Sequence, residues 1–226
     1  MVDAGPDTSC GLDCAAQEEF GLILNRCFEY SLDGTTAESP PSLGVWVKEI
    51  FELEGGVQTI AVEYRRGGQV LGIDYFAFPN SQLTLMRRIA GTSVTYRTGT
   101  AITGVTWLPM GASTGQNFNT TADAFLSADD STTSTSYRVT TEAPTTTEKR
   151  NPAGVDTTNA IKLLFGETPD HGSDPRRVFV PGVGFTLIAS PFNLLGGTAT
   201  VPNYLQRVRD IGSADGGNDP CSLGVP

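Results

Sequence analysis

The sequence predicts an all-β protein. We expect a single antiparallel, strongly curved sheet, in the form of a half-barrel or sandwich, with a short N-terminal helix. Short blocks of Val, Ile, Leu, Phe and Tyr recur along the 226 residues. Gly-Gly pairs separate three successive blocks, which is typical of hairpin turns. Within the blocks apolar and polar residues alternate, as in a sheet with one face covered and one exposed.

The helix is expected at 15–25, ahead of the first strand. Asp13 is a suitable N-cap because its side chain can accept from a free backbone N–H. Phe20 and Ile23 then lie on one helical face. Gly21 weakens the helix, at a cost of about 1 kcal/mol.

Strands are expected through most of the remaining chain. The runs lie at 27–32, 44–53, 57–66, 69–78, 81–90, 93–98, 159–167, 176–190 and 202–211. Ile60, Val62 and Tyr64 alternate with Glu63 along one of these strands, and acidic residues such as Glu63 and Asp74 are expected on the exposed face.

The run 176–190 contains the sequence Pro-Gly-Val-Gly at 181–184. Pro181 lacks an N–H and fixes φ, so it cannot lie within a paired central strand. The stretch therefore predicts two short strands or one bent strand, and we interpret it as a structural turn and not as a binding loop.

We expect one β-rich domain at 14–221. It is preceded by a polar tether at 1–13 and followed by a short tail at 222–226. The Thr/Ser-rich tract at about 127–150 is expected to be a loop region, with a strand indicated near Tyr137.

The four cysteines, Cys10, Cys14, Cys27 and Cys221, predict two disulfides. A zinc site is not expected, because only Cys10 and Cys14 are close in sequence. Four cysteines allow three pairings; we expect Cys221 to pair with Cys10 or Cys14, and Cys27 with the other. A bridge across the whole chain contributes about 4–5 kcal/mol in the chain-entropy view. Disulfides indicate an oxidising compartment.

The net charge is −10, from 25 acidic and 15 basic side chains. This balance argues against nucleic acid as a partner and against electrostatic docking on anionic lipid. No apolar run is long enough for a transmembrane helix, and the start of the sequence has no signal-peptide pattern.

No catalytic residue is predicted. The single histidine, His171, lies in a polar loop and the sequence has no nucleophile elbow. Paired carboxylates for glycan hydrolysis would come from Glu52, Glu54, Glu63 or Asp74, and nothing in the sequence selects two of them.

No cofactor is expected, with calcium as an alternative. Asp210, Asp215 and Asp219, with Asn218, supply oxygen ligands in a Gly-rich segment, which suits calcium, but their spacing matches no EF-hand loop. Asp129 and Asp130 supply oxygen ligands in a second loop, at 127–131.

Four aromatic residues, Trp46, Tyr64, Tyr75 and Trp107, are the candidates for lining a ligand pocket. A curved sheet readily leaves a cavity on its concave face. The alternative is that they simply belong to the core.

Several short motifs carry a family resemblance. They are Pro109–Gly115, Pro152-Ala153-Gly154 ahead of Ile161–Phe165, Pro181–Phe185, Tyr204-Leu205 and the start VDAGPDTSC. The chain resembles bacterial cell-envelope lipoproteins of unknown function, DUF3108-like β-proteins of the myxobacterial type. The resemblance implies a partly open antiparallel barrel without catalytic residues. It also implies a lipid anchor upstream of this sequence, because Thr8-Ser9-Cys10 is not a lipobox.

From these observations we expect a non-catalytic bacterial protein that is periplasmic, associated with the outer membrane or extracellular. It would bind a partner protein or an apolar ligand on the curved sheet. The alternative is a structural subunit of an envelope or surface assembly, and a glycan hydrolase comes third. A sizeable aromatic-lined cavity would favour a ligand, whereas a filled core with an exposed apolar patch would favour a subunit.

Overall fold

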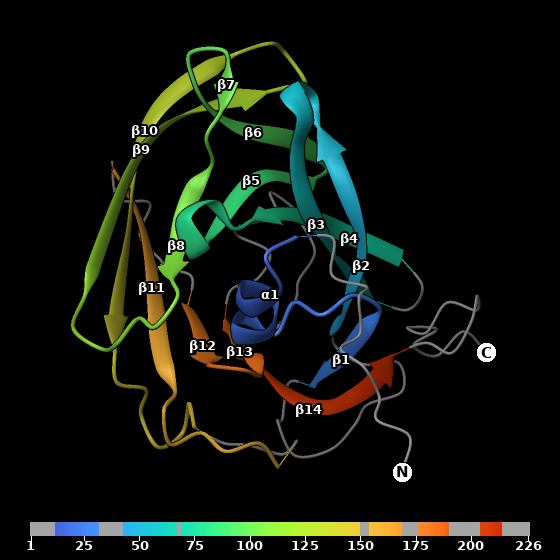
Figure 1. Cartoon of the computed structure of the whole chain (residues 1–226), viewed down its shortest axis with the longest axis vertical. Coiled ribbons are helices and arrows are strands. Elements are labelled where there is room, and N and C mark those ends of the chain that lie inside the picture. Colours follow the sequence, from blue (N-terminus) through green and yellow to red (C-terminus); the bar gives the residue numbers. More distant parts are fainter. Residues whose placement is uncertain are drawn as a thin grey trace.

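A computed structural model gives the fold (Figure 1). It describes residues 12–31, 43–66, 69–149, 154–168, 176–189 and 204–213. Of the residues singled out in the sequence, these ranges do not include Cys10, His171, Asp215, Asn218, Asp219 and Cys221. The tether before residue 12 and the tail also lie outside the described residues.

The described elements follow one another along the chain with strands in the great majority. They are α1 (Cys14–Phe20), β1 (Arg26–Ser31), β2 (Leu43–Leu53), the 3-10 turn η1 (Glu54–Gly56), β3 (Val57–Arg66), β4 (Gln69–Ala77), the 3-10 turn η2 (Pro79–Ser81), β5 (Gln82–Ala90), β6 (Thr92–Thr98), β7 (Ala101–Ile102), β8 (Val105–Pro109), β9 (Asn117–Leu126), β10 (Thr132–Glu142), β11 (Ile161–Thr168), β12 (Arg176–Val180), β13 (Gly184–Ala189) and β14 (Tyr204–Ser213).

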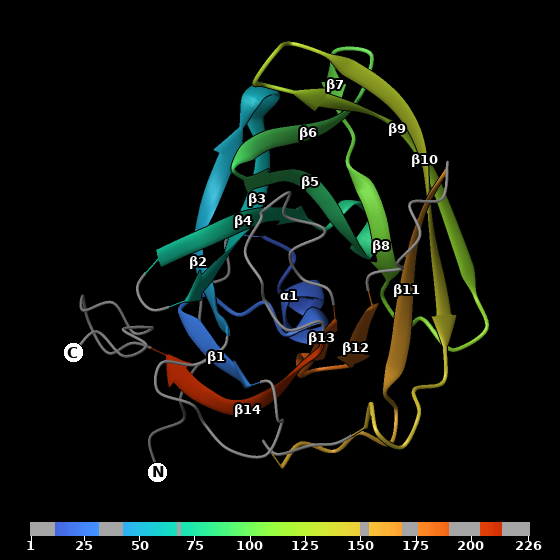
Figure 2. The same ribbon diagram turned by 180° about the vertical axis from the view of Figure 1, so that it is seen from behind.

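These strands form one antiparallel sheet that curls into a ring (Figures 1 and 2). Pairing runs from β6 through β9, β10, β11, β12, β13, β14, β1, β2, β3 and β4 to β5. One edge of β5 pairs with β4, and the other is shared by β8 at 82–85 and β6 at 87–90. The β5–β6 pairing closes the ring. The prediction of an all-β protein with a strongly curved antiparallel sheet is therefore confirmed, and the sheet is more nearly closed than a half-barrel.

The predicted helix is present as α1 but is shorter than expected. The Asp13 carboxylate accepts from the backbone N–H of Ala16 at 3.1 Å, which caps the first turn. The helix ends at Phe20 because Gly21 adopts a left-handed conformation, with φ 65°. In both ribbon views α1 lies inside the outline of the ring (Figures 1 and 2).

The Pro-Gly-Val-Gly stretch is the turn of a hairpin. Of the two predicted alternatives, two short strands or one bent strand, the first is confirmed. Residues 181–183 connect β12 to β13, and the backbone N–H of Val183 donates to the carbonyl of Val180 at 3.0 Å. The N–H of Gly182 donates to the carbonyl of Glu19 in α1 at 2.8 Å. A Cβ on Gly21 would overlap the Val183 carbonyl. The turn therefore packs directly on the end of α1.

The core lies inside the ring. Its buried members come from α1 and from strands all around the ring, and include Phe20, Phe28, Tyr30, Leu43, Val47, Ile60, Val62, Tyr64, Phe76, Leu83, Leu85, Trp107, Leu108, Leu163, Phe179 and Ile188. Two smaller clusters lie apart from it. One contains Leu53, Ala61, Tyr75, Ala77 and Met86, and the other contains Ala160, Val178, Val180 and Leu187. Because strand side chains alternate, these smaller clusters lie on the outer face.

The Thr/Ser tract contains the strand indicated near Tyr137. This strand, β10, pairs with both β9 and β11, and turns or irregular segments lie on either side of it. The β-branched Thr residues suit its extended conformation. One expectation about the sheet needs correction. Asp74 is not on the exposed face, because it is fully buried (0% exposed) within the ring. Glu63 does face outward, yet it is buried as well.

Neither described cysteine is a free thiol: Cys14 and Cys27 are both disulfide-bonded. Since Cys10 and Cys221 lie outside the described residues, the pairing proposed for the four cysteines stays a prediction. None of the helices in the described ranges has the length and apolar character needed to cross a bilayer.

Candidate functional site

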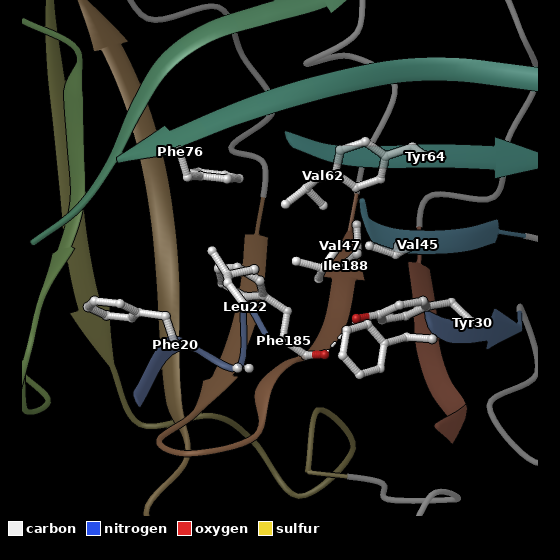
Figure 3. Close-up of a pocket in the computed structure, with 13 residues that line it drawn as sticks. Phe20, Leu22, Tyr30, Val45, Val47, Val62, Tyr64, Phe76, Phe185 and Ile188 are labelled. Carbon is white, nitrogen blue, oxygen red and sulfur yellow. Dashed lines mark hydrogen bonds between the residues drawn. The ribbon is translucent and has the colours of Figure 1, made fainter. Parts of the chain in front are cut away.

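A small cavity lies inside the ring between α1 and the surrounding strands (Figure 3). Its lining residues are Phe20, Gly21, Leu22, Phe28, Tyr30, Val45, Val47, Val62, Tyr64, Phe76, Gly184, Phe185 and Ile188. All are apolar apart from the hydroxyl groups of Tyr30 and Tyr64. The cavity measures about 20 Å³, which is room for about one water molecule.

The two tyrosine hydroxyls are fixed by different partners. Tyr30 donates to the carbonyl of Phe185 at 2.6 Å, which joins β1 to β13 across the cavity wall (Figure 3). Tyr64 donates to Oδ2 of Asp74 at 3.0 Å. The cavity therefore borders a buried charged group on one side.

Asp74 belongs to a buried ion pair. Its Oδ1 accepts from Nε of Arg88 at 2.6 Å and its Oδ2 accepts from Nη2 of Arg88 at 2.8 Å. The two residues are register partners on β4 and β5, which places both side chains on the inner face. Burial alone would lower the pKa of Arg88, but the Asp74 carboxylate outweighs it and raises the pKa above its ordinary value.

A second arginine, Arg177 on β12, is buried in the same interior at 2% exposure. Among the described residues, neither its Nε nor its Nη1 has a hydrogen-bond partner. Burial lowers the pKa of Arg177, and the neighbouring Tyr64 partly offsets that effect. Asp74, Arg88 and Tyr30 also act on this guanidinium electrostatically.

Trp107 on β8 connects the cavity to both arginines. The guanidinium carbons of Arg88 and Arg177 lie 5.7 and 5.8 Å from its ring centroid, within cation–π range. Its ring also packs on Phe76 at 4.9 Å and on Phe185 at 6.1 Å between centroids, and these two residues line the cavity. The cluster of Asp74, Arg88 and Arg177 around this ring carries one carboxylate and two guanidinium groups.

The four aromatic residues proposed for a pocket do not share one face. Tyr64 lines the cavity and Trp107 lies next to it, both inside the ring. Tyr75 is in an outer cluster and contacts Phe51, with ring centroids 5.2 Å apart. Trp46 is the register partner of the outward-facing Glu63, which also places it outside. The sequence does not show which of these residues point inward. Bulges shift the alternation along the strands, and buried apolar clusters lie on both faces of the sheet.

The four carboxylates weighed for hydrolysis have separate partners. Glu52 accepts from Gln58, Glu54 pairs with Arg87, Glu63 pairs with Lys48 and Arg65, and Asp74 pairs with Arg88. Within the described ranges no three acidic, His or Cys side chains come together as metal ligands. The calcium alternative stays a prediction, because Asp215, Asn218 and Asp219 lie outside those ranges.

Sequence reasoning missed the two inward arginines, although the sequence carries a signal for them. Each is the second member of an Arg-Arg pair within a strand run, at 87–88 and at 176–177. Neighbouring strand residues point to opposite faces. In a sheet that closes around its core, one arginine of such a pair can therefore point inward. The signal is not specific, because a third pair, Arg65 and Arg66, follows a bulge at the end of β3 and leaves Arg66 exposed.

Comparisons of the chain with family models, with curated proteins and with solved structures give no match.

Proposed function

We propose that the chain is a non-catalytic binding protein of the bacterial cell envelope or the extracellular space, and that its ligand binds inside the ring beside α1. The observation that carries this proposal is an apolar cavity whose lining residue Tyr64 acts electrostatically on Arg177, a buried cation whose Nε and Nη1 have no hydrogen-bond partner among the described residues. Apolar walls with a few converging polar groups are typical of small-molecule sites. The disulfide-bonded cysteines support an oxidising compartment.

Any ligand larger than a water molecule has to displace part of the cavity wall. One part of that wall comes from α1 and the residues that follow it, and not from the strands. This helix has 7 residues, and helices of that length are not stable without tertiary packing. The side chains of Phe20 and Leu22, at its end, close the cavity from that side. We therefore infer that ligand entry shifts α1 and leaves the strand ring in place.

Binding at this site can be followed by intrinsic fluorescence. The chain has two tryptophans, Trp46 outside the ring and Trp107 beside the cavity. In the Trp46→Phe variant, Trp107 is the remaining fluorophore. We expect decanol, a neutral apolar probe, to change its emission in a saturable way.

A matched pair of variants locates the site. Val45 lines the cavity, whereas Val57 lies against the outer cluster. Val45→Phe fills the cavity and should abolish the response to decanol, while Val57→Phe should keep it. Native mass spectrometry of protein from its own host provides the second readout. If no apolar probe binds and no small molecule accompanies the native protein, the proposed function is wrong.

A second candidate, a structural subunit of an envelope or surface assembly, is favoured by one observation. Phe51 is 40% exposed and packs on Tyr75 on the outer face, where Ile73 and Ile102 are also incompletely covered. An exposed apolar group of this kind suits contact with another protein. Under this alternative, Phe51→Asp disrupts a native assembly on size-exclusion chromatography and leaves probe binding unchanged.

A further inference from the structure

We propose that the ligand inside the ring carries a carboxylate and that Arg177 binds it. This inference rests on the proposed function, since it assigns the chemical class of the ligand at that same site. It makes Arg177 a binding residue and not only a part of the core.

The donors of Arg177 require an acceptor. A guanidinium keeps its proton at physiological pH, so burial cannot neutralise it as it can a lysine. Buried N–H groups are nearly always paired, and a buried charge without a partner is strongly unfavourable. Among the described residues, Nε and Nη1 of this guanidinium have no acceptor.

Asp74 is already committed to other groups. Its two oxygens accept from Nε and Nη2 of Arg88 and from the hydroxyl of Tyr64. With that pair neutralised, the charge of Arg177 is left over in the cluster. A ligand with a single negative charge would balance it.

A carboxylate fits this position best among common monoanions. It is planar and accepts in the plane in which a guanidinium donates, and such charge-assisted hydrogen bonds are the strong ones. The surroundings also fit an apolar continuation. Ile188, the register partner of Arg177, lines the cavity, as do Phe76 and Phe185. The carboxylate would belong either to a small free acid or to the end of an aliphatic chain.

The test compares three probes on the full chain in the Trp46→Phe background. They are decanoate, decanol and acetate, each titrated against Trp107 fluorescence and calorimetry near neutral pH. We expect decanoate to bind at least about tenfold more tightly than decanol, because a hydrogen bond to a charged group is worth more than one to a neutral group. If acetate binds as tightly as decanoate, the carboxylate assignment holds and the ligand is a small free acid.

Variants at Arg177 then assign the effect to this residue. Arg177→Met should reduce decanoate affinity to that of decanol and leave decanol binding unchanged, and Arg177→Lys should retain part of the preference. Arg97→Met is the matched control. Nε of Arg97 is also buried without a partner among the described residues, but its guanidinium lies over Phe125, on another part of the sheet. This control should leave the preference for decanoate intact.

The possible failures are distinguishable. Equal binding of decanoate and decanol, with no effect of Arg177→Met, overturns the carboxylate assignment and leaves the proposed function standing. Absence of binding by all three probes, together with the absence of any small molecule on the native protein in mass spectrometry, overturns the proposed function itself. Circular dichroism and thermal unfolding of each variant separate a lost site from a lost fold.

Discussion

The Asp74 carboxylate accepts two hydrogen bonds from the Arg88 guanidinium, at 2.6 and 2.8 Å, within the closed interior of the ring. The side chains of the pair are 1% and 6% exposed, so water does not compensate for the loss of either partner. Removing one partner of this pair should therefore destabilise the fold more than removing one partner of a surface ion pair.

Removing Asp74 alone is expected to be severe. Asp74→Asn leaves the Arg88 charge buried without its counter-charge, and should lower the free energy of unfolding by about 3–5 kcal/mol. The double change to Asp74→Leu and Arg88→Met should cost much less, because it removes both charges. Urea denaturation measures all of these.

The control for that series is Glu54→Gln, which breaks the exposed ion pair with Arg87. A surface pair contributes at most about 1 kcal/mol. The buried pair would have no special role in stability if Asp74→Asn proved as mild as this control.

Arg177 should behave in the opposite way. Its replacement by Met removes a buried charge while keeping a flexible apolar chain of similar length. In the absence of ligand, we expect Arg177→Met to raise the free energy of unfolding by about 1–3 kcal/mol, the cost of a buried group without a partner. Thermal and urea unfolding would show this gain, and a clear loss of stability would indicate that the guanidinium has a structural partner.

Stability should fall at alkaline pH. Burial raises the pKa of Tyr64, and the Asp74 carboxylate adds to the effect, so the folded state favours the protonated phenol. That contribution is complete below the unfolded pKa of about 10 and is lost as the pH rises above it. Urea unfolding at a series of pH values from neutral to about 11 measures this loss.

Tyr64→Phe should flatten the alkaline part of that curve, at a cost of about 1 kcal/mol at neutral pH for the lost hydrogen bond. The comparison is Tyr75→Phe, which changes a phenol in the outer cluster that contains Leu53 and Met86. Most of the alkaline loss should remain in that variant. An unchanged slope in Tyr64→Phe would contradict the prediction.

The contact between α1 and the hairpin turn predicts an unequal pair of glycine substitutions. Gly21 and Gly56 both have positive φ, at 65° and 77°. An added Cβ meets nothing within 4 Å at Gly56 but overlaps the Val183 carbonyl at Gly21. Gly56→Ala should cost about 1–2 kcal/mol for the backbone conformation alone, and Gly21→Ala clearly more. Equal shifts in melting temperature would mean that the turn does not pack tightly on the helix.

Local features of the fold were readable from the sequence. Period-2 alternation placed Ile60, Val62 and Tyr64 on the inner face, and the Pro-Gly-Val-Gly turn was recognised because proline cannot be paired inside a strand. The helix was predicted too long because the apolar spacing of Phe20 and Ile23 continued the helical pattern past Gly21, whose left-handed conformation ends the helix.

Features that depend on closure were not readable. Closure requires pairings between strands far apart in sequence, such as β6 with β9 and β1 with β14, and no local pattern encodes them. Without knowing that the inner face is enclosed, alternation alone placed Asp74 in solvent. The candidate site depends on the same closure, because Arg177 on β12 shares the interior with Asp74 and Arg88 on the paired strands β4 and β5.

The pairing of β1 with β14 has a consequence for the order of folding. Strand β1 precedes the other strands along the chain, yet one of its edges stays without a partner until β14 is in place. An unpaired edge is a template for association with other chains. In the unfinished fold this edge is therefore open to pairing with another chain until β14 covers it.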